Sequence, residues 1–179
     1  MSRINPKNPT LLDDTTSALL ADFSGKYGEF SNQAGLLSHS PAAMQHLYGL
    51  LKEWRTSATL PRRQVEIVVV TVSTLNKCPY CVAHHTPLLR DLGLSQESID
   101  QILDPNPVGF EALDLTTRDY ARAVIERPWG IRDELFYHVK KVYSEEQIVE
   151  LTVRISLCNL FNQFNLALDI PIESTLWKT

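Results

Sequence analysis

The hydrophobic residues of this chain recur mostly at helical intervals. Between Ser40 and about Ser57 the apolar positions are three, four and seven residues apart, which is the stripe of an amphipathic helix. Ser40-Pro41 is typical of a helix start, because serine caps the first turn and proline fits the first helical position. Residues 1–10, with their prolines and asparagines, are expected to form a loose lead-in. Weaker patterns predict helices over residues 11–27, 95–103, 116–126 and 132–142.

The stretch from Arg62 to Asn76 gives a conflicting signal. Its centre, Val65 to Val72, is rich in β-branched residues, which favour strands. However, the stretch continues from end to end without glycine or proline, and no second segment of this kind exists to pair with it. A single strand would leave its backbone groups unpaired, so we predict a buried helix.

The next helix is marked by both of its ends. Cys78-Pro79 is a typical start, and Gly93 suits the left-handed position that follows a helix. Pro87 lies inside this helix and is expected to kink or split it. With short connections between all these segments, the sequence predicts an all-α fold.

The last predicted helix begins with the capping-box pair Ser144 and Gln147 and continues to about Ala167. Residues 64–76 resemble residues 147–159 in their order of apolar and small polar positions. Two helices with one pattern indicate an internal duplication of a helical unit. The later copy has phenylalanine where the earlier one continues into cysteine, so any cysteine chemistry belongs to the earlier copy.

Composition and charge exclude several classes of function. The chain has 17 Lys and Arg against 21 Asp and Glu, a formal charge of -4, and no basic run, so nucleic-acid binding is not expected. Its start lacks the apolar core of a secretory signal, and the longest aliphatic run, Ile67 to Val70, is too short to cross a membrane. We therefore expect a cytoplasmic protein, in which a close cysteine pair is catalytic or metal-binding rather than structural.

The candidate chemistry is concentrated in Cys78-Pro79-Tyr80-Cys81 and the residues that follow. With Cys78 as N-cap, both sulfurs lie at the positive end of a helix, an environment that lowers thiol pKa values. Their spacing places them on one helix face, where small adjustments allow reversible disulfide formation. His85 lies one turn beyond Cys81 on that face and could accept its proton. The helix dipole alone favours Cys78 as the more acidic thiol.

Glu66 is the candidate partner of His85. The break at residues 76–79 lets the two helices fold back as an antiparallel hairpin. Glu66 lies about 15 Å before the break and His85 about 10 Å after it, so the two side chains should face each other. A carboxylate among valines is costly to bury without a partner. In the expected arrangement the acid orients the base, and the base activates the thiol.

Metal and cofactor sites have weaker support. A structural zinc site needs four ligands, and no second CxxC or HxxxH pattern is present. Covalent haem attachment would need histidine where Val82 stands. We therefore predict neither a metal nor an organic cofactor.

Other polar residues near the motif have simpler interpretations. His84 points away from His85 and is expected at the surface or at an interface. Tyr80 either packs or relays a proton, with packing favoured, and Cys158 is expected to fill the core. A polar stripe on the last helix could line a pocket or could simply pack: Asn159, Asn162, Gln163 and Asn165.

The spacing Glu66-x11-Cys78-x2-Cys81-x3-His85 resembles the signature of the AhpD-like alkylhydroperoxidases, which belong to the carboxymuconolactone decarboxylase superfamily. The resemblance covers residues 40–104, with a looser match in the closing helix, 144–170. It implies a single AhpD-like domain over residues 1–179, an all-α helical bundle with an internal duplication. It also implies a homo-oligomer, either a trimer or a hexamer.

The resemblance further implies a thiol peroxidase that reduces organic hydroperoxides or hydrogen peroxide without a cofactor. In the family scheme Cys81 attacks the peroxide, Cys78 resolves the sulfenic acid to a disulfide, and Glu66 and His85 relay protons. A dithiol, such as a lipoyl group carried by a protein, would then restore the thiols. Tyr80 stands where the best-studied pattern has histidine, so whether Tyr80 joins the relay is left open.

Three other functions remain as alternatives. One is a lyase like the decarboxylase that names the superfamily, but that branch acts on a lactone acid without a redox pair. Another is a thiol–disulfide oxidoreductase that acts on a protein partner through the same cysteines. The last is a helical oligomeric binding module in which the cysteines take no part.

Overall fold

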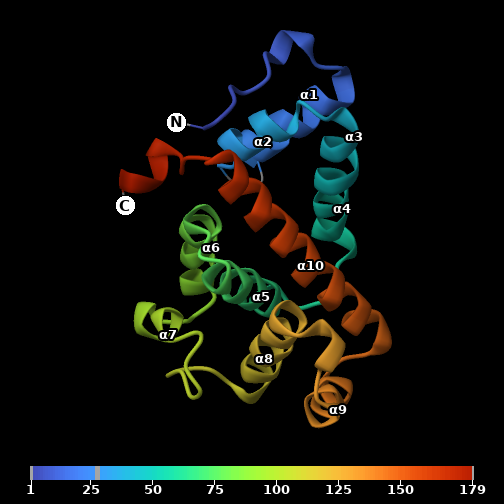
Figure 1. The fold of residues 1–179 in the computed structure, drawn as a ribbon, viewed down its shortest axis with the longest axis vertical. Coiled ribbons are helices and arrows are strands. Elements are labelled where there is room, and N and C mark those ends of the chain that lie inside the picture. The colour runs from blue at the N-terminus through green and yellow to red at the C-terminus, as the bar shows by residue number, and fades with distance from the viewer. Residues whose placement is uncertain (1, 27–28, 179) are drawn as a thin grey trace. The chain divides into compact units, whose positions relative to one another are not determined.

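The computed structural model describes residues 2–26 and 29–178. These residues form helices and contain no β-strand (Figure 1). The predicted all-α class is therefore confirmed. The chain divides into two compact units: one contains the residues up to Ala58 together with those from Asn165 onward, and the other is Thr59–Phe164. Over the described ranges, no helix is both long and apolar enough to cross a membrane. The single domain over residues 1–179 and the internal duplication stay predictions.

The first unit is built around a helical run that starts at Pro41. Ser40 caps this run by accepting a hydrogen bond from the Ala43 N–H, as predicted. Its rings pack closely, with the centroids of Phe23 and Tyr48 4.1 Å apart. The α-helices of the unit are α1 (Asp14–Ala21), α2 (Ser31–Leu37), α3 (Pro41–Ala43) and α4 (Gly49–Ser57), with a π-helical turn (Met44–Tyr48) joining α3 to α4.

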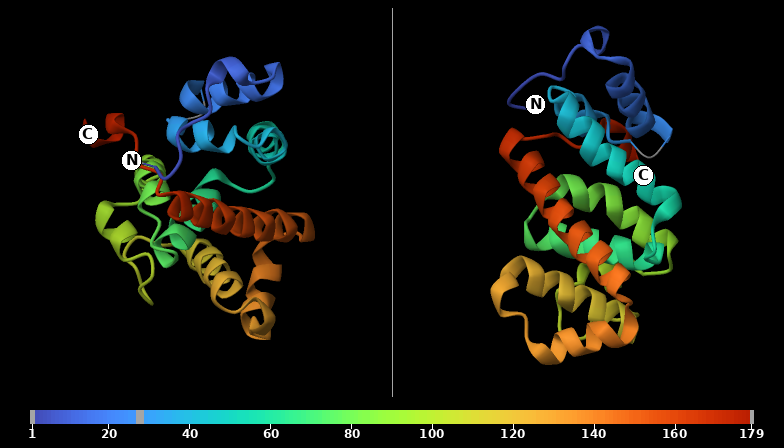
Figure 2. Two further views of the ribbon diagram at one scale, coloured as in Figure 1. Left: turned by 45° about the horizontal axis from the view of Figure 1, so that its top comes forward. Right: turned by 90° about the vertical axis from the view of Figure 1, so that its right-hand side faces the viewer.

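The second unit contains the candidate chemistry. Two of its helices, α5 and α6, lie side by side as a hairpin (Figure 1). A second pair, α8 with α9, also packs together, as the right view of Figure 2 shows. The helices are α5 (Arg62–Leu75), α6 (Pro79–Asp91), α7 (Gln96–Asp100), α8 (Ala112–Glu126), α9 (Asp133–Val142) and the greater part of α10 (Glu145–Leu168).

Helix α5 confirms the prediction of a buried helix despite its strand-like composition. Val68 and Val72 are fully buried in an apolar cluster with Leu151 of α10. Ile67 and Val70 are buried in a second cluster with residues of α6 and α7. Because apolar neighbours cover α5 on more than one face, burial of its valines outweighs their weak helix propensity.

Two helix ends and one internal proline show how local chemistry sets the boundaries of α6 and α8. Helix α8 begins at Ala112 rather than at residue 116, because Glu111 and Asp114 form a capping box one turn earlier. Of the predicted kink or split at Pro87, the split is wrong, since α6 is continuous from Pro79 to Asp91. Gly93 follows α6 at a φ of 93°, in the left-handed region where glycine is unstrained.

Arg63 joins the two helices of the α5–α6 hairpin at the end away from the turn. Its guanidinium contacts the buried Asp114 carboxylate, with Nη2 and Oδ2 2.6 Å apart, and its Nη1 donates to the Leu92 carbonyl at 2.9 Å. Hydrogen bonding to Asp114 raises the pKa of Arg63. One cation therefore joins the start of α5, the end of α6 and the first turn of α8.

Candidate active site

The turn between α5 and α6 fixes the position of the cysteine pair. Lys77 has a φ of 54°, the left-handed conformation in which helices commonly end. Cys78 is the N-cap of α6 and donates its backbone N–H to the Ser73 carbonyl at 2.9 Å. Pro79 then occupies the first helical position, as the sequence predicted. The turn places Cys78 and Cys81 on the first turn of α6.

Glu66 and His85 meet across the hairpin. His85 Nδ1 and Glu66 Oε2 are 2.7 Å apart, so the predicted facing of the two side chains is confirmed. The carboxylate is almost fully buried, with 8% of its side chain exposed, whereas 20% of the imidazole is exposed. With Nδ1 bonded to a carboxylate, Nε2 is the nitrogen that would exchange a proton during chemistry.

Both motif cysteines are thiols in this structure, and both are buried. Cys78 has no exposed surface, and 6% of Cys81 is exposed. A hydrogen bond with Cys78 raises the pKa of Cys81, and burial raises it further. This is the opposite of the lowering that the helix N-terminus led us to expect, because the Cys78 hydrogen bond and the low-dielectric surroundings both disfavour the thiolate. A proton acceptor is therefore needed if Cys81 is to react.

A polar cluster from α5 and α10 borders the cysteines. Asn162 is fully buried, and its Nδ2 donates to Ser73 Oγ at 3.1 Å. Asn76 donates to Oδ1 of Asn162 at 3.0 Å and to Oδ1 of Asn159 at 2.8 Å. Asn162 partly offsets the raising of the pKa of Cys81 by Cys78 and by burial. The sequence marked the asparagine stripe but could not tell a site residue from a packed one, because helical spacing does not reveal which element faces α10.

Cys158 of α10 is buried in the apolar cluster of the second unit, which confirms its interpretation as a core residue. Its sulfur lies 3.6 Å from Ser73 Oγ. Burial raises the pKa of Cys158 to about 12. A thiol of this kind stays protonated near neutral pH and is a poor nucleophile.

Two aromatic neighbours of the motif are packed inside. Tyr80 is 1% exposed, so packing is the role that its burial supports. The expectation of a surface or interface position for His84 is wrong, because the side chain is buried and its Nδ1 lies 2.7 Å from the Tyr80 carbonyl oxygen. The two rings stack with centroids 4.2 Å apart, which explains how the imidazole is covered.

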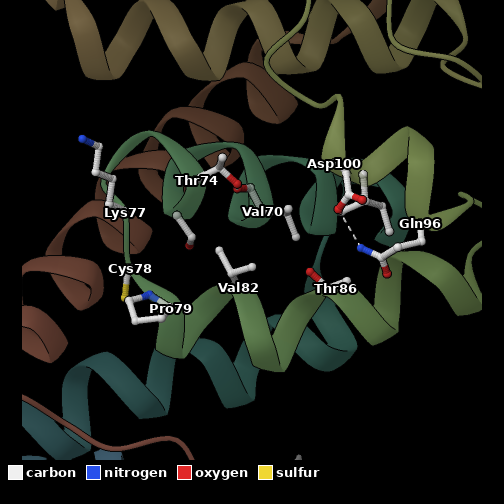
Figure 3. Close-up of a pocket in the computed structure, with 11 residues that line it drawn as sticks. Val70, Thr74, Lys77, Cys78, Pro79, Val82, Thr86, Gln96 and Asp100 are labelled. Atoms are coloured by element: carbon white, nitrogen blue, oxygen red, sulfur yellow. Dashed lines mark hydrogen bonds between the residues drawn. The ribbon is translucent and has the colours of Figure 1, made fainter. Parts of the chain in front are cut away.

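A pocket of about 500 Å³ opens between α5, α6 and α7. Figure 3 shows Lys77, Cys78 and Pro79 at one end of it and Gln96 and Asp100 at the other. Val70 and Val82 contribute apolar walls between these ends. Cys81 is absent from the lining, so the pocket reaches the backbone turn that carries Cys78 rather than the second cysteine.

Within the part of the chain that the structure describes, no three His, Cys, Asp or Glu side chains are grouped so that they could hold a metal ion. The site therefore offers two thiols, an acid–imidazole pair and an amide. Such a set can move protons and electron pairs at sulfur without a metal ligand shell.

Comparison with known proteins finds a matching family and a similar bacterial protein. Residues 41–106 match the model of the carboxymuconolactone decarboxylase family, close to the range over which the motif resemblance was found. YdfG of Bacillus subtilis strain 168, an uncharacterized protein, is 25% identical over 122 residues, which are 66% of this chain and 82% of YdfG.

Two solved structures share the fold. One is an uncharacterized peroxidase-related protein with an alkylhydroperoxidase AhpD core from Ralstonia eutropha JMP134, with a TM-score of 0.85 and 18% identity over 98% of this chain and 94% of that one. The other is the debrominase Bmp8, with a TM-score of 0.78 and 17% identity over the same shares of the two chains. At these identities the likeness concerns the fold.

Proposed function

We propose that the chain is a member of the carboxymuconolactone decarboxylase superfamily, whose family model matches residues 41–106, and that it is a thiol peroxidase that reduces organic hydroperoxides or hydrogen peroxide. Its AhpD-like fold supports this proposal. Cys81 is the attacking thiol, Cys78 the resolving thiol, and Glu66 with His85 the proton relay. The reaction needs neither a metal nor an organic cofactor.

The observation that carries the proposal is the Glu66–His85 contact at 2.7 Å on the hairpin that also carries both thiols. A buried Cys81 whose pKa is raised has to lose its proton to a nearby base before it can attack. An imidazole held by a buried carboxylate is suited to this task, because the carboxylate stabilises the imidazolium that forms.

The proposed cycle balances in three steps. The Cys81 sulfur attacks the outer peroxide oxygen, the O–O bond breaks, and ROOH plus thiol give ROH plus a sulfenic acid on Cys81. The Cys78 thiol then displaces water from that sulfenic acid and forms the Cys78–Cys81 disulfide. A dithiol finally attacks the disulfide and leaves as its own cyclic disulfide, which returns both thiols.

Burial of the pair favours small substrates over a protein disulfide. With Cys78 fully covered and Cys81 6% exposed, a folded partner protein could not bring its own disulfide against either sulfur without a rearrangement. This argues against the alternative of a protein thiol–disulfide oxidoreductase. A hydroperoxide is compact, and a lipoyl group on a protein arm is slender. We propose that the reductant approaches through the pocket that ends at Cys78.

We also propose that the protein acts as a homo-oligomer, a trimer or a hexamer, in the cytoplasm. Val149, Val153 and Leu160 are large apolar residues of α10 that are 40–64% exposed. Their spacing along one helix supports burial of this stripe against another copy of the chain.

The proposal is tested by consumption of cumene hydroperoxide with dihydrolipoamide as the reductant. Cys81→Ser should abolish turnover, and Cys78→Ser should leave one sulfenic acid on Cys81 for each chain, which a dimedone adduct would reveal by mass spectrometry. Cys158→Ser is the matched control and should retain turnover. If Cys78→Ser and Cys81→Ser both match the wild type, the thiols are bystanders and the proposal fails.

The decarboxylase-like lyase and the debrominase define the other substrates to include. Parallel assays with a lactone acid and with a brominated pyrrole, each with and without dithiol, would detect these activities. Turnover of the lactone acid by Cys78→Ser and Cys81→Ser, with no peroxide consumption by the wild type, would replace the peroxidase with a lyase.

A further inference from the structure

The turn between α5 and α6 is tied to α10 by side-chain hydrogen bonds that the proposed cycle does not use. We propose that Asn76, the residue that ends α5, is a positioning residue whose amide holds this turn against α10 and so determines how easily a reductant reaches the Cys78 sulfur. The inference rests on the proposed function, in which Cys78 is the resolving thiol and the dithiol approaches through the pocket that ends there.

Asn76 uses both hydrogens of its side-chain amide on α10. Its Nδ2 donates to Oδ1 of Asn159 at 2.8 Å and to Oδ1 of Asn162 at 3.0 Å. The two acceptors are three residues apart and so lie on one face of α10. Asn162 in turn donates its own Nδ2 to Ser73 Oγ in the last turn of α5, at 3.1 Å. Helix α10 therefore holds the end of α5 at two points, Ser73 and Asn76.

The position of Cys78 depends on the same segment of chain. The backbone N–H of Cys78 donates to the Ser73 carbonyl at 2.9 Å, and that of Lys77 donates to the Thr74 carbonyl at 3.1 Å. The backbone of the turn is therefore joined to the end of α5, which α10 holds. A displacement of the turn away from α10 breaks the two hydrogen bonds from Asn76.

The turn also covers the sulfur of Cys78. This residue has no exposed surface, whereas its neighbours Lys77 and Pro79 are both exposed. The same three residues line one end of the pocket, where Figure 3 shows them together. The sulfur is thus separated from the pocket by a short surface segment rather than by a packed core. Displacement of that segment would open the sulfur to a small reagent.

The Asn76 hydrogen bonds favour the closed position of the turn. Asn162 is fully buried and Asn76 is half-buried, so water has limited access to the acceptors. A hydrogen bond in such surroundings is stronger than one at an open surface. Loss of both bonds should therefore increase the open fraction of the turn about tenfold or more.

The test is the alkylation of Cys78 by iodoacetamide at pH 8 in the reduced full chain, with the modified residue located by tandem mass spectrometry. Asn76→Ala removes both bonds to α10, and Asn159→Ala removes one of them. Thr74→Val is the matched control, because the Thr74 hydroxyl lines the same pocket but bonds to a carbonyl within α5, at 2.7 Å. Alkylation of Cys158 in the same samples reports general opening of the protein.

We expect Cys78 to be alkylated about tenfold or more faster in Asn76→Ala, about threefold faster in Asn159→Ala, and within twofold of the wild-type rate in Thr74→Val. The ratio of Cys78 to Cys158 alkylation should increase equally, which general destabilisation would not produce. Asn159→Ala serves alone if Asn76→Ala does not fold. An unchanged Cys78 rate in the folded variant, or equal acceleration at Cys78 and Cys158, would overturn the inference.

The oxidised protein gives a second measurement. With the Cys78–Cys81 disulfide formed by diamide, its reduction by dihydrolipoamide should be faster in Asn76→Ala by a similar factor and unchanged in Thr74→Val. Neither measurement uses a peroxide. Failure of the wild type to consume peroxide would therefore remove the proposed function, whereas an unchanged reduction rate in Asn76→Ala would remove only this inference.

Discussion

Replacing Glu66 with glutamine tests the proton relay most directly. The substitution keeps the size of the side chain and its contact with His85 but removes the negative charge that faces the imidazole. The fold should survive, because an uncharged amide among the valines of α5 costs less to bury than a carboxylate. We therefore expect Glu66→Gln to remain folded and to attack peroxide more slowly.

The size of the effect follows from the geometry of the pair. The contact is 2.7 Å long, and only 8% of the carboxylate side chain and 20% of the imidazole side chain are exposed. A hydrogen bond to a charged partner contributes about 1.5–3 kcal/mol, against about 1 kcal/mol for a neutral one. The loss is therefore about 0.5–2 kcal/mol in the stability of the imidazolium, which corresponds to a rate about 2–30 times lower.

The assay is single-turnover oxidation of the thiols by excess cumene hydroperoxide, with the remaining thiols counted after acid quenching. Glu150→Gln is the matched control, since Glu150 is another buried acid of the second unit, paired with Arg154 at 2.7 Å. That control should oxidise at the wild-type rate even if it is less stable. An oxidation rate in Glu66→Gln within twofold of the wild type, or an equal loss in the control, would refute the relay.

Three further predictions concern stability and pH. Asp114→Asn should lower the free energy of unfolding in urea by about 2–4 kcal/mol, because it leaves the Arg63 guanidinium without its buried carboxylate; no change in the midpoint would contradict the anchoring role. Alkylation of Cys81 should keep rising with pH above 9.0, the ordinary pKa of the thiol, since the folded protein raises it; a plateau near pH 7 would contradict this. The same thiol in urea should level off near its ordinary pKa. Ser144→Ala removes the hydroxyl that accepts the Gln147 N–H at 3.2 Å and should cost about 1 kcal/mol of stability, measured by thermal unfolding, whereas Ser156→Ala on an exposed face of the same helix should cost less.

The sequence predicted those parts of the fold that depend on local signals and on simple geometry. Caps at Ser40 and Ser144 and the left-handed residue Gly93 mark boundaries that the structure reproduces. The facing of Glu66 and His85 followed from the rise per residue of two antiparallel helices and needed no knowledge of the other elements. Helix α5 could be predicted because a lone strand has no partner for its backbone.

Features that depend on packing between distant segments could not be predicted in this way. His84 was expected at the surface or at an interface. The sequence shows on which face of α6 it lies, but it does not show that other residues bury that face. The raised pKa of Cys81 comes from burial and from Cys78, and burial depends on the whole fold rather than on the helix start. Asn162 is 81 positions after Cys81 in the chain, so only the packing of α10 reveals its effect on the pKa of Cys81.

The complete enclosure of Cys78 sets a condition on any catalytic cycle. A sulfur with no accessible surface can be approached by a dithiol only after a local rearrangement that uncovers it. Reduction of the Cys78–Cys81 disulfide would then be limited by local opening of the protein rather than by encounter with the dithiol. The rate of reduction would therefore level off as the dithiol concentration increases. Lys77, in the turn before Cys78, already has a left-handed backbone, where helices usually carry glycine, so an opening that changed its φ would relieve rather than add backbone strain.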